Sequence, residues 1–358
     1  MKKLEQIVSK YINDVCRNIR NTSDDKELFY LYNRELSGLD EVIRFNDLNI
    51  YVPYELENYR KYGFDGYESF AFVYYDGFKE IYNSVKEINK DLALVGGELF
   101  GERELVYDVK PSLELSISDS MKIVQLFFEY YDNDVKKHFK KICDDDNLIV
   151  APLFNGNTID GFTLTLNSLK ENFIEVNFRN DILLSSNIIH EVFHSYVESH
   201  MFDLSYDERK KRLWNNLDEV ITYFSSLVFI QFLEEINFDN NSIQFLKSDS
   251  ASRMIFFTGE FNKYFDLTYE DIIFGGFEDY LLSDSIAYGT LLAYHYYDKY
   301  LLDENKVKDD ILNMSLDTAN KDKMFLLNNY GLSSDDIGDL DIPKKILRKY
   351  GYNFTEKK

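Results

Sequence analysis

The amino-acid sequence predicts an α+β fold, in which a small antiparallel sheet and a helix lie between two mostly helical regions. Apolar and polar residues alternate in the runs 162–166 and 174–178, which is the period of a half-buried strand. On either side of these runs, apolar residues recur every three or four positions, as is typical of amphipathic helices. We therefore divide the chain into a helical region 1–112, a central domain 113–302 and a helical region 303–358.

Three helices are expected in the first region. They cover about 4–19, 27–43 and 67–88, where apolar positions recur at helical spacing. The following stretch, 92–109, contains three glycines and is expected to form a break or short strands. Pro111 then marks the boundary with the central domain.

The central domain is expected to open with a long helix that is capped by Ser118 or Asp119 and ends near Cys143. A second helix, capped by Ser185 or Ser186, carries apolar residues at helical spacing up to position 197. The later segments are a polar, basic break at 207–212, an apolar helix from about 215 to 232 and a helix at 283–300.

Three strands are expected between the first two of these helices. The run 148–154 is apolar, and Asn155-Gly156 after it is typical of a two-residue hairpin turn. The alternating runs 162–166 and 174–178 complete a small antiparallel sheet, which directly precedes the second helix.

The bulk composition excludes several classes of protein. The formal net charge of −23 repels phosphate backbones and anionic lipids, so we expect neither nucleic acid nor a membrane as a partner. Two cysteines do not make a disulfide framework. No apolar window reaches the length of a signal peptide core or a transmembrane helix. We therefore expect a cytoplasmic protein.

The residues that carry chemistry lie in the second helix of the central domain. His190 and His194 are four positions apart, which places both side chains on one face of a helix, where two imidazoles can bind one tetrahedral metal. Glu191 follows the first histidine, and from there it can take a proton from the attacking water and pass it to a leaving amine. This is the His-Glu-x-x-His arrangement of zinc-dependent peptidases, and we expect Zn²⁺ as the cofactor.

Two residues compete for the place of third ligand. His200 has the spacing of the third histidine in metzincins, but Val197 stands where that motif has the glycine that turns the chain back to the metal. Glu219 lies at the start of the next helix, which carries no further charge until Glu234. A carboxylate entering so apolar a segment needs a partner, and a metal is one. We favour Glu219 and keep His200 as the alternative.

The segment from His190 to Val197, together with Asp218-Glu219-Val220, resembles the gluzincin pattern. It is particularly similar to the bacterial DUF4932 group, over roughly 118–231, although Glu198-Ser199 replaces the Asn-Pro that often follows the motif there. The resemblance implies a zincin-like catalytic domain with zinc on His190, His194 and Glu219. It also implies that the strand 173–179 is an edge that pairs with an extended peptide.

The sequence thus predicts a zinc metallopeptidase that acts on a peptide or protein substrate, with Glu191 as general base. Tyr223, Tyr288 and His295 are candidates for the donor that stabilises the developing oxyanion. The alternative is a non-enzymatic, acidic, helical interaction protein in which the histidine pair is incidental or structural.

Overall fold

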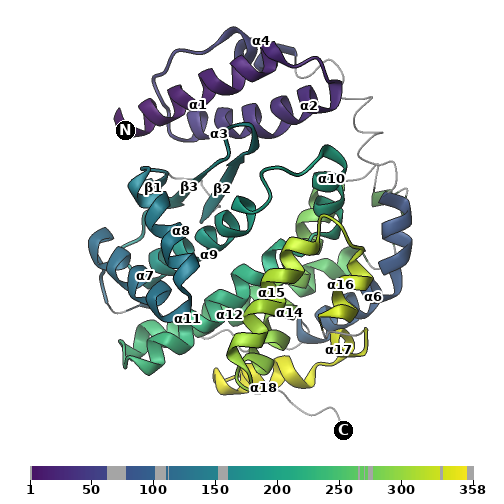
Figure 1. The fold of residues 1–358 in the computed structure, drawn as a ribbon. Coiled ribbons are helices and arrows are strands. Elements are labelled where there is room, and N and C mark those ends of the chain that lie inside the picture. Colours follow the sequence, from purple (N-terminus) through teal and green to yellow (C-terminus); the bar gives the residue numbers. More distant parts are fainter. Residues whose placement is uncertain are drawn as a thin grey trace.

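The computed structural model describes residues 2–62, 78–100, 110–111, 113–151, 160–264, 267–269, 271–272, 277–330 and 334–352. In these residues the protein is mostly helical and contains one small sheet (Figure 1). The sheet lies between the N-terminal helices, drawn in purple, and the larger group of helices that follows it in the chain (Figure 1). Three predicted features lie outside the described residues: the helix segment 67–77, the segment 101–109 and the turn at Asn155-Gly156.

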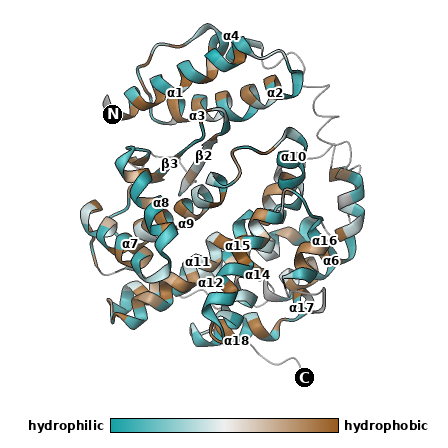
Figure 2. Ribbon diagram, in the orientation of Figure 1, coloured by the Kyte–Doolittle hydropathy of each residue, from teal (hydrophilic) through white to brown (hydrophobic). Residues whose placement is uncertain are grey.

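The N-terminal helices pack around their own apolar core. The ribbon of the first helix alternates between hydrophilic and hydrophobic colours, as its three-to-four spacing predicts (Figure 2). The second predicted helix, 27–43, is confirmed, although it contains a π-helical segment in its middle. The elements are α1 (Lys2–Asn21), α2 (Asp25–Tyr30), the π-helical η1 (Leu31–Leu36), α3 (Ser37–Phe45) and α4 (Tyr54–Tyr62).

The helix α6 (Phe78–Phe100) continues through two of the glycines that were expected to break it, so that expectation is wrong as far as residue 100. The glycines serve a helix crossing instead. A Cβ atom on Gly96 would lie 1.8 Å from the carbonyl oxygen of Thr258 in α12 (Asn240–Phe261). Only a residue without a side chain lets the two backbones approach so closely.

The sheet is mixed, which corrects the antiparallel sheet expected from the sequence. β3 runs antiparallel to β2, with Ile174 opposite Thr163, and parallel to β1, with Ile174 opposite Leu148. The first two strands are therefore not neighbours, because the third is inserted between them; alternation within a strand identifies its buried face and not its partner. The strands are β1 (Leu148–Ala151), β2 (Gly161–Leu166) and β3 (Glu171–Asn177), in the order β1-β3-β2.

This order also changes which strand lies at the edge. β3 has a hydrogen-bonded neighbour on each side, so the expectation that 173–179 forms an edge strand is wrong. In the part of the chain that the structure describes, β2 is an outer strand of the sheet, with β3 on one side and no strand on the other.

Successive residues of the central strand face two different cores. Phe173 packs with the N-terminal helices, whereas Ile174 and Val176 belong to the large core beneath the sheet. Leu164 of β2 likewise faces the N-terminal helices. Thr163, which lies opposite Ile174, therefore points toward the helix α9 (Ile182–Ser199) below the sheet.

The helices around the sheet begin one turn earlier than expected. Ser116 caps α7 (Ile117–Tyr131), since its hydroxyl accepts a hydrogen bond from the backbone N–H of Asp119. Asp181 caps α9 in the same way, through the backbone N–H of Leu183. The expected long helix is also divided, because Asp132 ends α7 and caps a new helix, α8 (Asn133–Asp144). Residues that can cap a helix occur at more than one position near the start of each of these helices. The sequence therefore locates the cap only approximately.

The segment 207–212, expected as a break, is part of the helix α10 (Tyr206–Asn215). Ser205 and Glu208 form a capping box at its start, with each side chain bonded to the other's backbone N–H. Asn216 adopts a left-handed conformation, with φ of 55°, and ends it. The chain then turns directly into α11 (Asp218–Glu235).

The remaining helices enclose α11 in the large core. α12 and α14 both pack against it and against each other. None of the helices in the described part of the chain is both long and apolar enough to cross a membrane. The later elements are α14 (Phe277–Tyr300), α15 (Glu304–Asp317), α16 (Lys323–Asn329), α17 (Ser334–Gly338) and α18 (Asp341–Lys349), with single 3₁₀ turns at η3 (Asn167–Leu169) and η4 (Asn262–Tyr264).

Candidate active site

A cleft of about 670 Å³ opens between β2, α9, α11, α12 and α14. His190, Glu191 and His194 reach it from α9, and Glu219 reaches it from the first turn of α11. The four residues that the sequence singled out therefore line one cavity, although they come from two helices.

Two histidines and one carboxylate converge at the floor of this cleft. Their ligand atoms all lie within 4.8 Å of one another. The two Nε2 atoms are 3.2 Å apart, and Glu219 places one oxygen 3.4 Å from His190 Nε2 and the other 3.4 Å from His194 Nε2. A tetrahedral zinc site with bonds of about 2.0–2.1 Å has edges of about 3.3 Å between ligands. The two histidine nitrogens lie at about that spacing, and Glu219 has one oxygen close to it from each histidine, so the donor set suits a zinc ion.

The three groups are also strongly coupled electrostatically. Burial alone would lower the pKa of His194, but the Glu219 carboxylate beside it raises that pKa to about 9. Burial would raise the pKa of Glu219, yet the two histidines hold it well below its usual range. The Glu219 carboxylate thus stays ionised beside the two histidines, and an anionic carboxylate is also a ligand that a cation at this point would use.

Glu191 lies beside this cluster and is held from the sheet. Its side chain is buried, and the hydroxyl of Thr163 in β2 lies 2.9 Å from its Oε2 atom. Burial raises the pKa of Glu191. A Cβ atom on Gly161 would lie 3.1 Å from Glu191 Cγ, so the start of β2 is in close contact with this side chain. Glu191 therefore has one orientation, toward the cleft that it lines.

Glu219 is held on two sides. The hydroxyl of Thr222, one turn along α11, lies 3.0 Å from its Oε2 atom. On the other side, α14 crosses α11 at Gly289, where an added Cβ atom would lie 2.3 Å from Glu219 Cβ. The absence of a side chain at Gly289 is thus required for Glu219 to occupy its place.

His200 lies elsewhere. It ends α9, and its Nδ1 atom is 2.8 Å from the carbonyl oxygen of Tyr196. Among the described residues, the group that could hold a metal ion consists of His190, His194 and Glu219 and does not include His200.

Of the three candidate oxyanion donors, Tyr223 lines the cleft. Its ring meets that of His190 edge to face, with centroids 5.3 Å apart. Burial raises the pKa of Tyr223, so its O–H group keeps its proton and can donate. Tyr288 instead donates to Asn89 Oδ1 at 2.6 Å, and the buried His295 is not among the residues that line the cleft.

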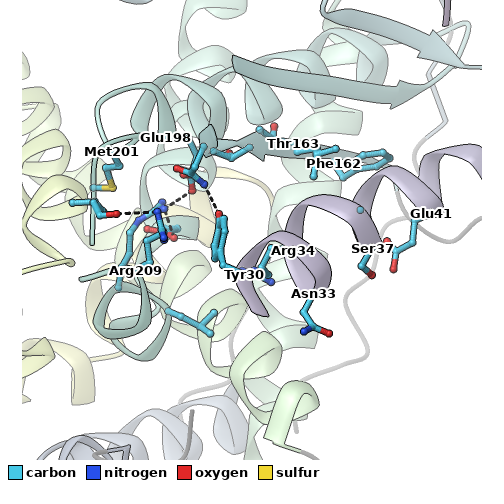
Figure 3. Close-up of a pocket in the computed structure, with 18 residues that line it drawn as sticks. Tyr30, Asn33, Arg34, Ser37, Glu41, Phe162, Thr163, Glu198, Met201 and Arg209 are labelled. Carbon is cyan, nitrogen blue, oxygen red and sulfur yellow. Dashed lines mark hydrogen bonds and ion pairs between the residues drawn. The ribbon is translucent and has the colours of Figure 1, made fainter. Parts of the chain in front are cut away.

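A second pocket, of about 390 Å³, lies where the N-terminal helices approach β2 (Figure 3). Tyr30, Asn33 and Arg34 line it from α2 and η1. Phe162 and Thr163 line both this pocket and the cleft, so the two cavities are neighbours at β2.

Sequence reasoning missed one charged residue at this junction. Arg212 of α10 is largely shielded from solvent and forms ion pairs with Glu198 in α9 and Asp218 in α11. The basic run 207–212 has no apolar residues at helical spacing, so the sequence pattern did not indicate that Arg212 would lie on the inner side of a helix. The signal was the capping box of Ser205 and Glu208, which predicts a helix at this place.

Neither the family models nor the curated protein sequences match this chain. The solved structures that align with this chain include three peptidases, each with a TM-score below 0.5. One is described as an oligoendopeptidase F from Bacillus anthracis str. Ames; the TM-score is 0.48 at 13% identity, over 95% of this chain and 64% of that one. The second is PZ peptidase A with an inhibitor; the TM-score is 0.47 at 12% identity, over 97% of this chain and 70% of that one. The third is a peptidase from Chlamydophila abortus; the TM-score is 0.44 at 12% identity, over 97% of this chain and 60% of that one.

The chain thus spans less than two thirds of the length of the first and third of these proteins. Identities of 12–13% do not carry an activity from one chain to another.

Proposed function

We propose that the protein is a zinc-dependent peptidase, with His190, His194 and Glu219 as the zinc ligands and Glu191 as the general base. The observation that carries the proposal is the convergence of one ligand atom from each of these three side chains within 4.8 Å of one another, with the two Nε2 atoms 3.2 Å apart, close to the edge of a tetrahedral zinc site. Three protein ligands leave a fourth position free, as in catalytic zinc sites and unlike closed structural ones.

The roles of the side chains follow from their positions. A zinc ion held there would act as a Lewis acid on the substrate carbonyl and would lower the pKa of a bound water. Glu191 accepts a proton from the attacking water and returns it to the nitrogen of the leaving amine. Tyr223, on the same wall as His190, donates a hydrogen bond to the oxygen on which negative charge develops.

The substrate backbone binds along β2. Among the described residues this strand has a neighbour on one side only, and its residues Gly161 and Phe162 line the cleft that contains the four site residues. An extended peptide can add to such an edge through main-chain hydrogen bonds. Since the cleft and the second pocket share Phe162 and Thr163, the peptide on one side of the scissile bond continues into the second pocket.

The decisive experiment measures zinc and turnover together. Elemental analysis of the purified protein should give about one zinc ion per chain, and a library of quenched fluorescent peptides should contain substrates whose cleavage stops with a chelator and resumes with zinc. Glu191→Gln should lower kcat by about 10²–10⁴-fold while zinc stays bound. Protein that lacks stoichiometric zinc, or a Glu191→Gln variant that cleaves peptides normally, would contradict the proposal.

The same experiment separates two other functions. Zinc without cleavage of any peptide, but with hydrolysis of other amides, would identify a hydrolase of different specificity. A protein without zinc and without activity would be the non-enzymatic interaction protein.

A further inference from the structure

Arg212 touches two carboxylates that belong to different helices of the site. Its guanidinium group pairs with Glu198 in α9 and lies 2.9 Å from Asp218 Oδ2 in α11. The Arg212 side chain is only 11% exposed, so both ion pairs are largely shielded from water and salt.

Each of these carboxylates is adjacent to a proposed zinc ligand. Glu198 lies four residues after His194, so it is one turn further along the same face of α9. Asp218 immediately precedes Glu219 in the first turn of α11. The guanidinium group of arginine is a rigid planar fork whose N–H groups can bind two carboxylates at once. Arg212 therefore sets the separation between the two helices close to the points from which His194 and Glu219 extend.

A second arginine in the same helix shows that this contact is specific. Arg209 lies one turn before Arg212, lines the same pocket and is similarly buried (Figure 3). Its guanidinium group, however, binds Glu27 and the carbonyl oxygen of Leu204, and it stacks 4.1 Å above the ring of Tyr30. Arg209 thus connects α10 to the N-terminal helices, whereas Arg212 connects it to the ligand-bearing ones.

We propose that Arg212 is a positioning residue for the metal site. It holds α9 and α11 at the separation at which His190, His194 and Glu219 share one zinc ion. This inference rests on the proposed function, because it assigns Arg212 a role in a site whose zinc ligands are themselves proposed. Arg212 acts through its two carboxylate partners and is not among the residues that line the cleft.

Arg212→Lys in the full chain tests this role, because lysine keeps the charge and removes the fork. Arg209→Lys is the matched control in the same helix and pocket. The measurements are zinc affinity, by competition with a chromophoric chelator, and the visible spectrum of the cobalt(II)-substituted protein, which reports ligand geometry. Substitution of a supporting residue around a metal site typically costs about 10–100-fold in affinity. We expect such a loss and an altered cobalt spectrum for Arg212→Lys, and neither for Arg209→Lys.

Several results would overturn the assignment. It fails if folded Arg212→Lys binds zinc as tightly as the wild type with the same cobalt spectrum, or if Arg209→Lys weakens binding equally. Should Arg212→Lys not fold, Asp218→Asn removes the charge of the Arg212 partner that does not line the cleft and must still weaken zinc binding. A wild-type protein that binds neither zinc nor cobalt overturns the proposed function itself, and the role of Arg212 with it.

Discussion

Two groups of buried, charged side chains lie in the large core, and they differ in how their charges are balanced. Lys323 and Asp284 form a sealed pair, with 2.7 Å between Nζ and Oδ2 and side chains that are 1% and 4% exposed. The Lys323 ammonium group also lies 3.6 Å from the centroid of the Tyr288 ring. His190, His194 and Glu219 are each about one-fifth exposed and open into the cleft.

The difference separates a structural pair from a binding site. A sealed pair with one positive and one negative charge needs nothing further, and its loss affects folding. The open group directs three ligand atoms at one point, which leaves that point available to an ion from solution. Buried charged side chains therefore do not by themselves identify a binding site. A binding site is identified when several ligand atoms converge on one point that solvent can reach.

The largest effect is expected from Glu219→Gln. Replacing the carboxylate removes one ligand and the only negative charge among the three proposed ligands, so zinc affinity should fall by about 10³-fold or more, or about 4 kcal/mol. The free energy of unfolding of the metal-free protein should change by less than about 2 kcal/mol. Isothermal titration with zinc and denaturant unfolding measure the two quantities. Unchanged zinc affinity in this variant would contradict the assignment of Glu219.

The opposite result is expected for Lys323→Met. It leaves Asp284 buried without its partner, which should cost about 3–5 kcal/mol of unfolding free energy. Zinc affinity of the folded fraction should not change, because neither residue lines the cleft. Chemical denaturation and zinc titration on the same preparation make this test. If Lys323→Met weakened zinc binding as much as Glu219→Gln does, the distinction between the two groups would fail.

Zinc itself should stabilise the wild type through the open group. An ion that binds only the folded state adds about 2.7 kcal/mol when its concentration is 100 times the dissociation constant. Thermal melting with and without zinc should therefore show a higher Tm with zinc in the wild type. Asp284→Asn should start from a lower Tm and show the same rise in Tm when zinc is added at that excess. Glu219→Gln should show little rise in Tm at the zinc concentration used for the wild type.

A smaller, pH-dependent effect should come from His295, which is buried outside the cleft. Neither of its ring nitrogens has a hydrogen-bond partner among the described residues, and burial lowers its pKa to about 4 despite the nearby carboxylates of Asp336, Asp339 and Asp298. Because the unfolded state binds the proton more readily, stability is complete above about pH 6.5 and falls as the pH drops toward 4.

Between about pH 6.5 and pH 5 the loss attributable to His295 should be about 2 kcal/mol. Unfolding free energies of the wild type and of His295→Leu, measured across this range, give the contribution as a difference. Identical pH dependence in both proteins would contradict it.

Local patterns in the sequence predicted much of this molecule. The three-to-four spacing in α1 and the i, i+4 pair in α9 depend only on helix geometry, so His190 and His194 had to lie on one face. Glu219 was singled out because a carboxylate at the start of an apolar helix needs a partner, and it lies 3.4 Å from both histidines. The role of these residues as zinc ligands stays a prediction.

What the sequence did not predict depends on contacts between distant segments. The insertion of β3 between β1 and β2 is a pairing between separate segments, which alternation within one strand does not reveal. Arg212 was missed for a similar reason, since its partners Glu198 and Asp218 come from two other helices. The glycines of α6 were misinterpreted because their partner, α12, is far away in the chain.

The close contact between Gly289 and Glu219 also bears on how other chains of this kind can be recognised. A His-Glu-x-x-His segment by itself occurs by chance, and the glutamate that follows it is one of many. In this fold that glutamate is Glu219, against which the later helix α14 packs through a glycine, Gly289. A search pattern that joins the histidine pair, a glutamate opening an apolar helix and a glycine within a second apolar helix would reject most accidental matches.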